Sequence, residues 1–271
     1  MKEITNSELL QLQLDILQEV DSFCRKNNIQ YTVDGGTCIG AVRHKGYIPW
    51  DDDIDIAMTR PNYEKFIHSF NGKCQNLEVL APELNWNYYA PYANVCDKRT
   101  ILYEGCNGHR GMEIGVKIDV FPIDGVAQNL NEYRANRKRQ KKLWMDMYVK
   151  RIILSILWKN DPKFALRVLL KKLLLCLTSY ESLQKASRKL AVKYQFETSQ
   201  YVEDFTNPFT REVRCSHQAF EEYMDIPFEN ITVSIIKGYD EYLTKLFGNY
   251  MQLPPEEKRI SHHGFKAYWK Y

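Results

Sequence analysis

The sequence lacks any apolar run long enough to cross a membrane. Its strongest apolar stretches, residues 152–158 and 173–177, fall far short of the roughly 20 residues that span a bilayer. Residues 1–13 also lack the apolar core of a secretory signal peptide. These absences argue against a membrane-spanning protein and predict a cytoplasmic one, with peripheral binding to the inner face of the membrane left open.

Cysteine is neither frequent nor regularly spaced. The seven Cys residues are odd in number and form no CxxC pair, which argues against a disulfide framework and predicts a reducing compartment. Repeats and low-complexity tracts are also missing, and the apolar content of 44% and charged content of 26% are ordinary. The composition therefore excludes disorder, collagen and repeat arrays, and 271 residues suffice to bury a substantial core.

A small net charge of +3 conceals one strongly basic segment. Residues 134–172 hold thirteen Lys or Arg and only two Asp, a net charge of +11 that leaves −8 for the rest of the chain. Apolar residues alternate with these cations at helical spacing. The segment predicts either helices packed on their own core or an amphipathic surface for an anionic membrane. No recognition motif accompanies it, so nucleic acid is not an expected partner.

Local patterns in the first half predict alternating helices and strands. Thr5 and Glu8 have capping-box spacing, and apolar residues then recur at helical intervals as far as the Asn-Asn pair at 27–28. A short β-branched run leads into Gly35-Gly36, a signal for a tight turn. Further helices are predicted over 37–43 and 63–70, and strands over 29–33, 53–58, 77–80, 92–96 and 116–121, the last ended by Pro122.

The second half is predicted to be helical. Basic helical periodicity runs from 131 to about 196, with a break at Asp161-Pro162. We therefore expect an α/β fold in which a mixed-sheet catalytic core precedes a helical C-terminal half. The expected divisions are a core over 1–130, a basic helical region over 131–200, and a helical region over 201–271 that completes the site.

The acidic run Asp51, Asp52, Asp53 and Asp55 needs a counter-charge. Two carboxylates 4 Å apart repel by roughly 4 kcal/mol at an effective dielectric near 20. A solvated acidic turn is the alternative, but alternation with apolar residues from Asp53 onward predicts a strand with one carboxylate face. A calcium loop is excluded, because Ile56 stands where its glycine is required and the twelfth position is not Glu. The pattern favours Mg²⁺ or Mn²⁺.

Three separated signals combine into one predicted centre. The turn at Gly35-Gly36 lets backbone approach phosphates, Asp53 and Asp55 form D-x-D on the next strand, and Asp119 lies on a later strand. Nucleotidyltransferase-type folds use this arrangement for metal-assisted phosphoryl transfer. We expect Asp53, Asp55 and Asp119 to hold the metal, with Asp119 as a third ligand or as the base that takes a hydroxyl proton.

The runs DGGTCIGAVRHKGYIPWDDDIDIAM, KIDVFPIDG and LPPEEKRISHH resemble the LicD family of phosphocholine transferases, to which the fukutin-type enzymes are related. The resemblance covers residues 31–125 and 248–269. It implies a nucleotidyltransferase-like fold, CDP-choline as donor, CMP as by-product, and as acceptor a sugar hydroxyl of a cell-surface glycan or its lipid-linked precursor. Relatives that move other phosphoalcohols, such as ribitol phosphate, leave the transferred group open.

Several further residues are candidates for substrate binding, each with structural packing or capping as the alternative. Cations before the acidic strand and near the C-terminus suit donor phosphates. Aromatic faces suit the quaternary ammonium of choline. The binding candidates are Gly35, Gly36, Thr37, Arg43, His44, Trp50, Arg259, His262 and His263, with Lys45, Trp86, Tyr88, Tyr89 and Tyr92 weaker. A zinc site at Cys96, Cys106 and His109 lacks a fourth ligand.

Two rival functions remain open from the sequence. A true nucleotidyltransferase would attack the α-phosphate of a triphosphate and release pyrophosphate. A catalytically silent protein could bind a membrane surface and store a cation in its acidic cluster. The joint presence of Asp53, Asp55 and Asp119 favours an enzyme.

Overall fold

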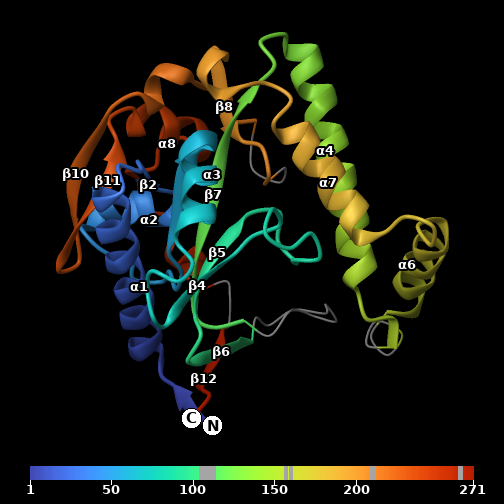
Figure 1. The fold of residues 1–271 in the computed structure, drawn as a ribbon, viewed down its shortest axis with the longest axis horizontal. Coiled ribbons are helices and arrows are strands. Elements are labelled where there is room, and N and C mark those ends of the chain that lie inside the picture. Colours follow the sequence, from blue (N-terminus) through green and yellow to red (C-terminus); the bar gives the residue numbers. More distant parts are fainter. Residues whose placement is uncertain (104–113, 156–157, 159–160, 208–211, 262–264) are drawn as a thin grey trace.

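The computed structural model describes residues 1–103, 114–155, 158, 161–207, 212–261 and 265–271. Its central feature is a mixed seven-stranded sheet (Figure 1). The order of the first five strands is β2 (Thr32–Val33), β3 (Asp55–Thr59), β7 (Lys117–Val126), β5 (Ala93–Asp97) and β4 (Leu77–Leu80). The other two strands extend the sheet from β7, because β8 (Tyr201–Asp204) pairs with β7 and β9 (Cys215–Ser216) pairs with β8. Strands β3 and β7 are parallel and the other pairs are antiparallel. The mixed sheet confirms the α/β fold.

The helices of the first half follow the predicted signals. Helix α1 (Asn6–Lys26) begins with the predicted capping box, in which Thr5 Oγ1 accepts a hydrogen bond from the Glu8 amide and Glu8 accepts one from the Thr5 amide. Helix α2 (Gly35–Ile39) leads directly into a π-helical turn, η1 (Gly40–His44), and α3 (Arg60–Ser69) follows β3. Their apolar faces join the sheet in the main hydrophobic core.

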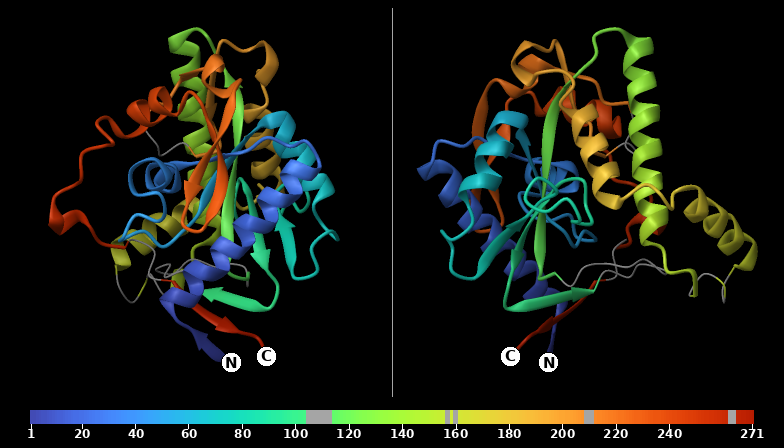
Figure 2. Two further views of the ribbon diagram at one scale, coloured as in Figure 1. Left: turned by 90° about the vertical axis from the view of Figure 1, so that its left-hand side faces the viewer. Right: turned by 45° about the vertical axis from the view of Figure 1, so that its right-hand side comes forward.

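A separate helical layer is formed by α4 (Leu130–Arg151) and α7 (Tyr180–Ala191). The two helices lie side by side in Figures 1 and 2, with α6 (Pro162–Leu174) at the end of α4 away from β8. The break before α6 was predicted, and Asp161 caps the helix by accepting from the Phe164 amide at 2.9 Å. Small apolar clusters of their own hold the α4–α7 and α4–α6 contacts. No described helix is long and apolar enough to span a bilayer.

The C-terminal region differs from its predicted helical character. The described part of residues 201–271 contains the strands β8 to β12 and one α-helix, α8 (Tyr239–Phe247). Short 3₁₀ turns lie nearby at η2 (Phe196–Thr198), η3 (His217–Phe220) and η4 (Glu256–Lys258). Strands β10 (Tyr223–Phe228) and β11 (Ile231–Ile236) form a hairpin, and β12 (Lys266–Trp269) pairs with β1 (Lys2–Ile4) and β6 (Thr100–Tyr103). The three-stranded sheet β1–β12–β6 brings the two termini together (Figures 1 and 2). The predicted helical character is therefore found in α4, α6, α7 and α8, whereas the rest of the described part of 201–271 consists mainly of strands, turns and loops.

The prediction that Pro122 ends its strand is wrong. Strand β7 continues to Val126 and changes antiparallel partner around the proline. Strand β5 pairs with β7 up to Val120, and β8 begins to pair at Ile123. Proline lacks an amide donor, so it is tolerated at this change of partner.

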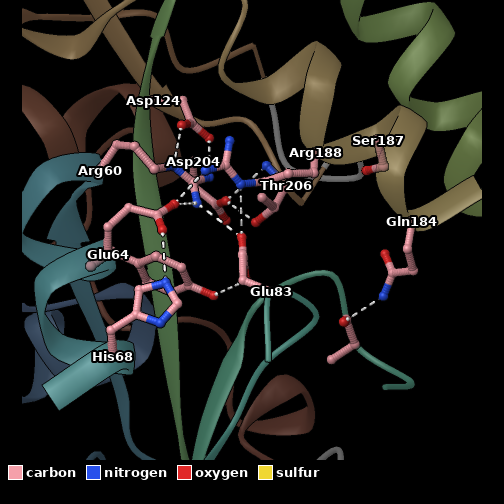
Figure 3. A network of polar contacts seen from close by, with 12 residues as sticks. Arg60, Glu64, His68, Glu83, Asp124, Gln184, Ser187, Arg188, Asp204 and Thr206 are labelled. Atoms are coloured by element: carbon pink, nitrogen blue, oxygen red, sulfur yellow. Dashed lines mark hydrogen bonds and ion pairs between the residues drawn. The ribbon is translucent and has the colours of Figure 1, made fainter. Parts of the chain in front are cut away.

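A network of buried and half-buried ion pairs connects the helical layer to the sheet (Figure 3). Arg60 of α3 donates to both oxygens of Asp124 on β7, at 2.7 and 2.8 Å, and lies 3.3 Å from Glu83. Arg188 of α7 contacts Glu64 at 2.5 Å and also approaches Glu83 at 3.0 Å. Removing one member of a buried pair commonly costs about 3–5 kcal/mol, because its partner stays buried and uncompensated. The network therefore fixes α7 against α3 and β7.

Candidate active site

The site is built where the parallel strands β3 and β7 begin. Asp55 is the first residue of β3, and its register partner on β7 is Asp119. Cross-strand partners project to the same face of a sheet, so the two carboxylates meet on one face. On the other side of β7, Asn94 of β5 is the register partner of Asp119. The predicted association of Asp55 with Asp119 thus follows from strand pairing.

The glycine pair packs against the carboxylates. Gly35 has a φ of +51°, and a Cβ on it would lie 3.1 Å from Asp55 Oδ2. A Cβ on Gly36 would lie 2.4 Å from Asp51 Oδ2. Thr37 fixes the same strand end, because its hydroxyl accepts a hydrogen bond from the Asp55 amide at 2.9 Å. These residues therefore have a role the sequence did not predict, which is to hold backbone close to the acidic cluster.

The acidic turn places three carboxylates within reach of one ion. Among the residues that the structure describes, Asp51, Asp52 and Asp53 offer ligand oxygens within 4.8 Å of one another, and all three are half-buried. The predicted metal set was Asp53, Asp55 and Asp119. Asp53 belongs to both sets, and it lies close enough to Asp55 for its charge to raise the pKa of that carboxyl group.

Negative charge accumulates around Asp55. Burial raises the pKa of this carboxyl group well above its usual range, and the charges of Asp53, Asp119 and Asp34 raise the pKa further. Lys117 opposes the shift. A divalent cation bound by oxygen ligands would stabilise the charged form of such a group. The all-oxygen donor set fits Mg²⁺ or Mn²⁺ rather than a softer metal.

Asp119 is oriented by neighbours that the sequence reasoning missed. Lys117 Nζ lies 2.7 Å from Asp119 Oδ1, and the Asn94 side-chain amide donates to the same oxygen. Asn94 in turn accepts hydrogen bonds from the hydroxyls of Tyr88 and Tyr89. An adjacent ammonium favours the charged form of a carboxylate, which both a metal ligand and a base require. The Asn94 amide restricts rotation of the Asp119 carboxylate, and the Tyr88 and Tyr89 hydroxyls hold the Asn94 side chain in turn.

The cations expected at the donor phosphates contact the C-terminal tail. Arg43 Nη1 donates to the Tyr250 carbonyl at 2.6 Å, and Arg43 Nε donates to His44 Nε2 at 2.9 Å. Burial lowers the pKa of His44, and the Arg43 charge lowers it further. A neutral His44 can accept the Arg43 hydrogen bond. Arg43 therefore ties the tail to η1.

Trp50 brings together two other candidates. The Arg259 guanidinium lies 5.6 Å from the Trp50 ring centroid, and His44 meets the ring edge-on at 6.3 Å. Ser261 also reaches the acidic turn, where its hydroxyl donates to Asp52 at 2.5 Å. The C-terminal tail therefore contacts both Trp50 and the acidic turn. His262 and His263 lie outside the described residues.

The remaining aromatic candidates are mostly structural. Tyr88 is fully buried, Tyr92 packs on Phe121 at a ring distance of 4.4 Å, and Trp86 stacks with the Lys185 ammonium. Lys45 has a left-handed backbone, and its carbonyl accepts from the Glu229 amide. Of the weak zinc set, Cys96 is buried in β5, whereas Cys106 and His109 lie outside the described part of the chain.

Comparison with known proteins agrees with this geometry. Residues 28–152 match the LicD/FKTN/FKRP nucleotidyltransferase domain, a range that contains Gly35, Asp55 and Asp119. Along 278 aligned residues the chain is 30% identical to the lipopolysaccharide cholinephosphotransferase LicD of Haemophilus influenzae, with 99% of each chain covered. An uncharacterized protein of Rickettsia prowazekii is 46% identical over 87 residues, covering 31% of this chain and 29% of that protein. The chain therefore belongs to the LicD family and is a transferase.

Proposed function

We propose that this protein transfers phosphocholine from CDP-choline to a sugar hydroxyl of a lipopolysaccharide and releases CMP, with Mg²⁺ or Mn²⁺ as cofactor. The observation that carries the proposal is the register of Asp55 with Asp119 beside the Gly35-Gly36 turn. The full-length similarity to a lipopolysaccharide cholinephosphotransferase supports the choice of group and acceptor. We place the reaction in the cytoplasm, at the inner face of the membrane.

The carboxylates divide into two roles in this proposal. Asp53, Asp55 and Asp119 would hold the ion, which when bound neutralises charge on the donor pyrophosphate. Asp119 takes the proton of the acceptor hydroxyl while the hydroxyl oxygen attacks the choline-bearing phosphorus. The bond from that phosphorus to the bridging oxygen breaks, and CMP leaves with the electron pair. Lys117 and Asn94 hold the Asp119 carboxylate for this step.

The donor would lie between the glycine turn and the C-terminal tail. Gly35, Gly36 and Thr37 would face its pyrophosphate, and Arg259 with His44 would contact its phosphates from the tail side. Trp50 would present a ring face to the choline ammonium, a contact worth about 0.5–2 kcal/mol. Because Arg259 lies over that ring, choline would occupy its other face or displace the guanidinium.

The direct test offers purified protein a panel of CDP-alcohols, with magnesium and a lipopolysaccharide lacking phosphocholine. CMP and pyrophosphate are measured together. The proposal expects CMP from CDP-choline, with weaker release from CDP-ethanolamine and CDP-ribitol and no pyrophosphate from CTP. Preference for CDP-ribitol would reassign the transferred group, and pyrophosphate release from CTP would make the protein a nucleotidyltransferase.

A further inference from the structure

Helix α6 has apolar residues on two opposite faces. One face packs on the end of α4, where the buried side chains of Val168 and Leu175 join Val149 and Ile152 in one cluster. Ala165 is buried as well. This packing buries the first face. In Figure 1 and in the right-hand view of Figure 2, the helix projects outward from the rest of the molecule.

The second face is a leucine stripe exposed to solvent. Its members recur at helical spacing, and their exposed fractions rise toward the end of the helix, from 48% at Leu166 through 54% at Leu170 and 60% at Leu173 to 80% at Leu174. Leu177, just beyond the helix, is 98% exposed. Single exposed leucines are ordinary in proteins, but a contiguous stripe of this kind usually marks an interaction surface. We call these five residues the leucine stripe.

Cations border the leucine stripe. Lys163 and Arg167 are exposed on α6, and the helix contains no Asp or Glu. Lys171 and Lys172 are used within the protein, because Lys171 pairs with Asp146 at 2.8 Å and Lys172 donates to the Ile152 carbonyl at 2.7 Å. They attach α6 to α4. The outer surface of α6 therefore combines apolar area with the positive charge of Lys163 and Arg167.

We propose that α6 is a docking element for an anionic lipid bilayer, with the leucine stripe inserted among the headgroups and Lys163 and Arg167 contacting lipid phosphates. Interfacial helices combine these two features, since apolar burial supplies affinity and cations select anionic lipid. A second protein copy would cover the leucines, but the flanking cations of two copies would then repel each other. The charge therefore favours a membrane.

The placement of α6 suits a membrane-linked acceptor. Arg151, at the end of α4 beside α6, stacks on the Tyr89 ring at 5.6 Å. Tyr89 donates to Asn94, which contacts Asp119. The docking helix and the catalytic carboxylates are thus connected through the same end of α4. Docking itself does not depend on the proposed chemistry.

The test is co-sedimentation of the full chain with vesicles of phosphatidylcholine alone or mixed equally with phosphatidylglycerol. We expect binding to the anionic vesicles at low salt and weaker binding as salt rises. The variant Leu170→Gln/Leu173→Gln/Leu174→Gln should bind at least tenfold more weakly. The variant Lys163→Gln/Arg167→Gln should lose most of the preference for anionic vesicles. Circular dichroism and thermal unfolding establish that each variant is folded.

The matched control removes three exposed apolar side chains elsewhere, in Leu84→Gln/Leu130→Gln/Phe247→Gln. This control should bind vesicles as the wild type does. Failure of the wild type to bind anionic vesicles at low salt would overturn the proposal, as would an equal loss in the control. Light scattering gives the other outcome: a wild-type dimer that the leucine variant dissociates, without vesicle binding, would make α6 a self-association surface.

Discussion

Asp55 and Asp119 are direct register partners across the parallel strands β3 and β7. Their carboxylates share one face of the sheet, beside a glycine turn that leaves room for little else. Lys117 opposes the combined negative charge of Asp53, Asp119 and Asp34 that acts on Asp55. The arrangement is unfavourable for the protein alone and suited to a cation and a phosphorylated ligand, which is why we assign the chemistry here.

Replacing Asp119 with Asn should lower turnover by at least a hundredfold while changing donor affinity much less. The reason is that a base acts in the transition state, whereas the donor is also held by other residues. Calorimetry with a non-hydrolysable CDP-choline analogue measures the binding term, and CMP release measures turnover. Asp225→Asn, an exposed carboxylate on β10, is the matched control and should leave both unchanged. If donor binding disappeared together with turnover, Asp119 would be a ground-state ligand only.

Gly35→Ala should reduce turnover at least tenfold, whereas Gly72→Ala should not. Both glycines have positive φ, at +51° and +81°, so both substitutions introduce similar backbone strain of about 1 kcal/mol. The new methyl group at Gly35 would press on Asp55 Oδ2, but at Gly72 it would meet no atom within 4 Å. Thermal unfolding should therefore shift similarly in the two variants, and turnover should separate them. Equal turnover would mean that close approach to Asp55 has no catalytic importance.

Stability should fall as pH rises from about 4 to 7, in part because of Asp204. Burial raises the pKa of this carboxyl group to about 7, against an unfolded value near 3.9, although the Thr206 hydrogen bond opposes the shift. The folded state then retains a proton that the unfolded state loses, so the contribution is present at low pH and lost on raising it. Asp204→Asn should be more stable than the wild type at pH 8 by about 1–3 kcal/mol and nearly equal at pH 4.

Urea unfolding at several pH values checks this expectation, with Asp225→Asn as an exposed control that keeps the wild-type profile. Buried Glu203, whose pKa burial also raises to about 7, should leave a residual slope of the same sign in Asp204→Asn. A steeper loss of stability with pH in that variant would contradict the assignment.

Elements whose start, end or alternation is set by neighbouring residues were predicted from the sequence. The capping box at Thr5 and Glu8, the strand over 77–80 and the break at Asp161-Pro162 were all confirmed. The β10–β11 hairpin was missed although its two strands are neighbours in the sequence, whereas β12 was missed because its partners are remote. For example, Trp269 pairs with Lys2, and Lys266 pairs with Tyr103. Residue spacing carries no information about such pairings.

The contrast between local signals and remote strand pairing also explains which residues of the site could be predicted. Alternation predicted which Asp residues share a face, and the glycine pair marked the turn beside them. Lys117 could have been found, because it lies two residues before Asp119 in a strand. Asn94 could not, since it reaches Asp119 only through the pairing of β5 with β7. The divisions at 130 and 200, the metal and the donor stay predictions.

Product balance under metal control tests the central claim most directly. Protein in excess over CDP-choline is mixed with lipopolysaccharide lacking phosphocholine, either with Mg²⁺ or with chelator, and CMP and phosphocholine-labelled lipopolysaccharide are quantified. The account predicts equal amounts of both products with Mg²⁺, and almost none with chelator or with the Asp55→Asn protein. Equal yields in chelator, or full activity of Asp55→Asn with Mg²⁺, would contradict metal-assisted transfer at Asp55 and Asp119.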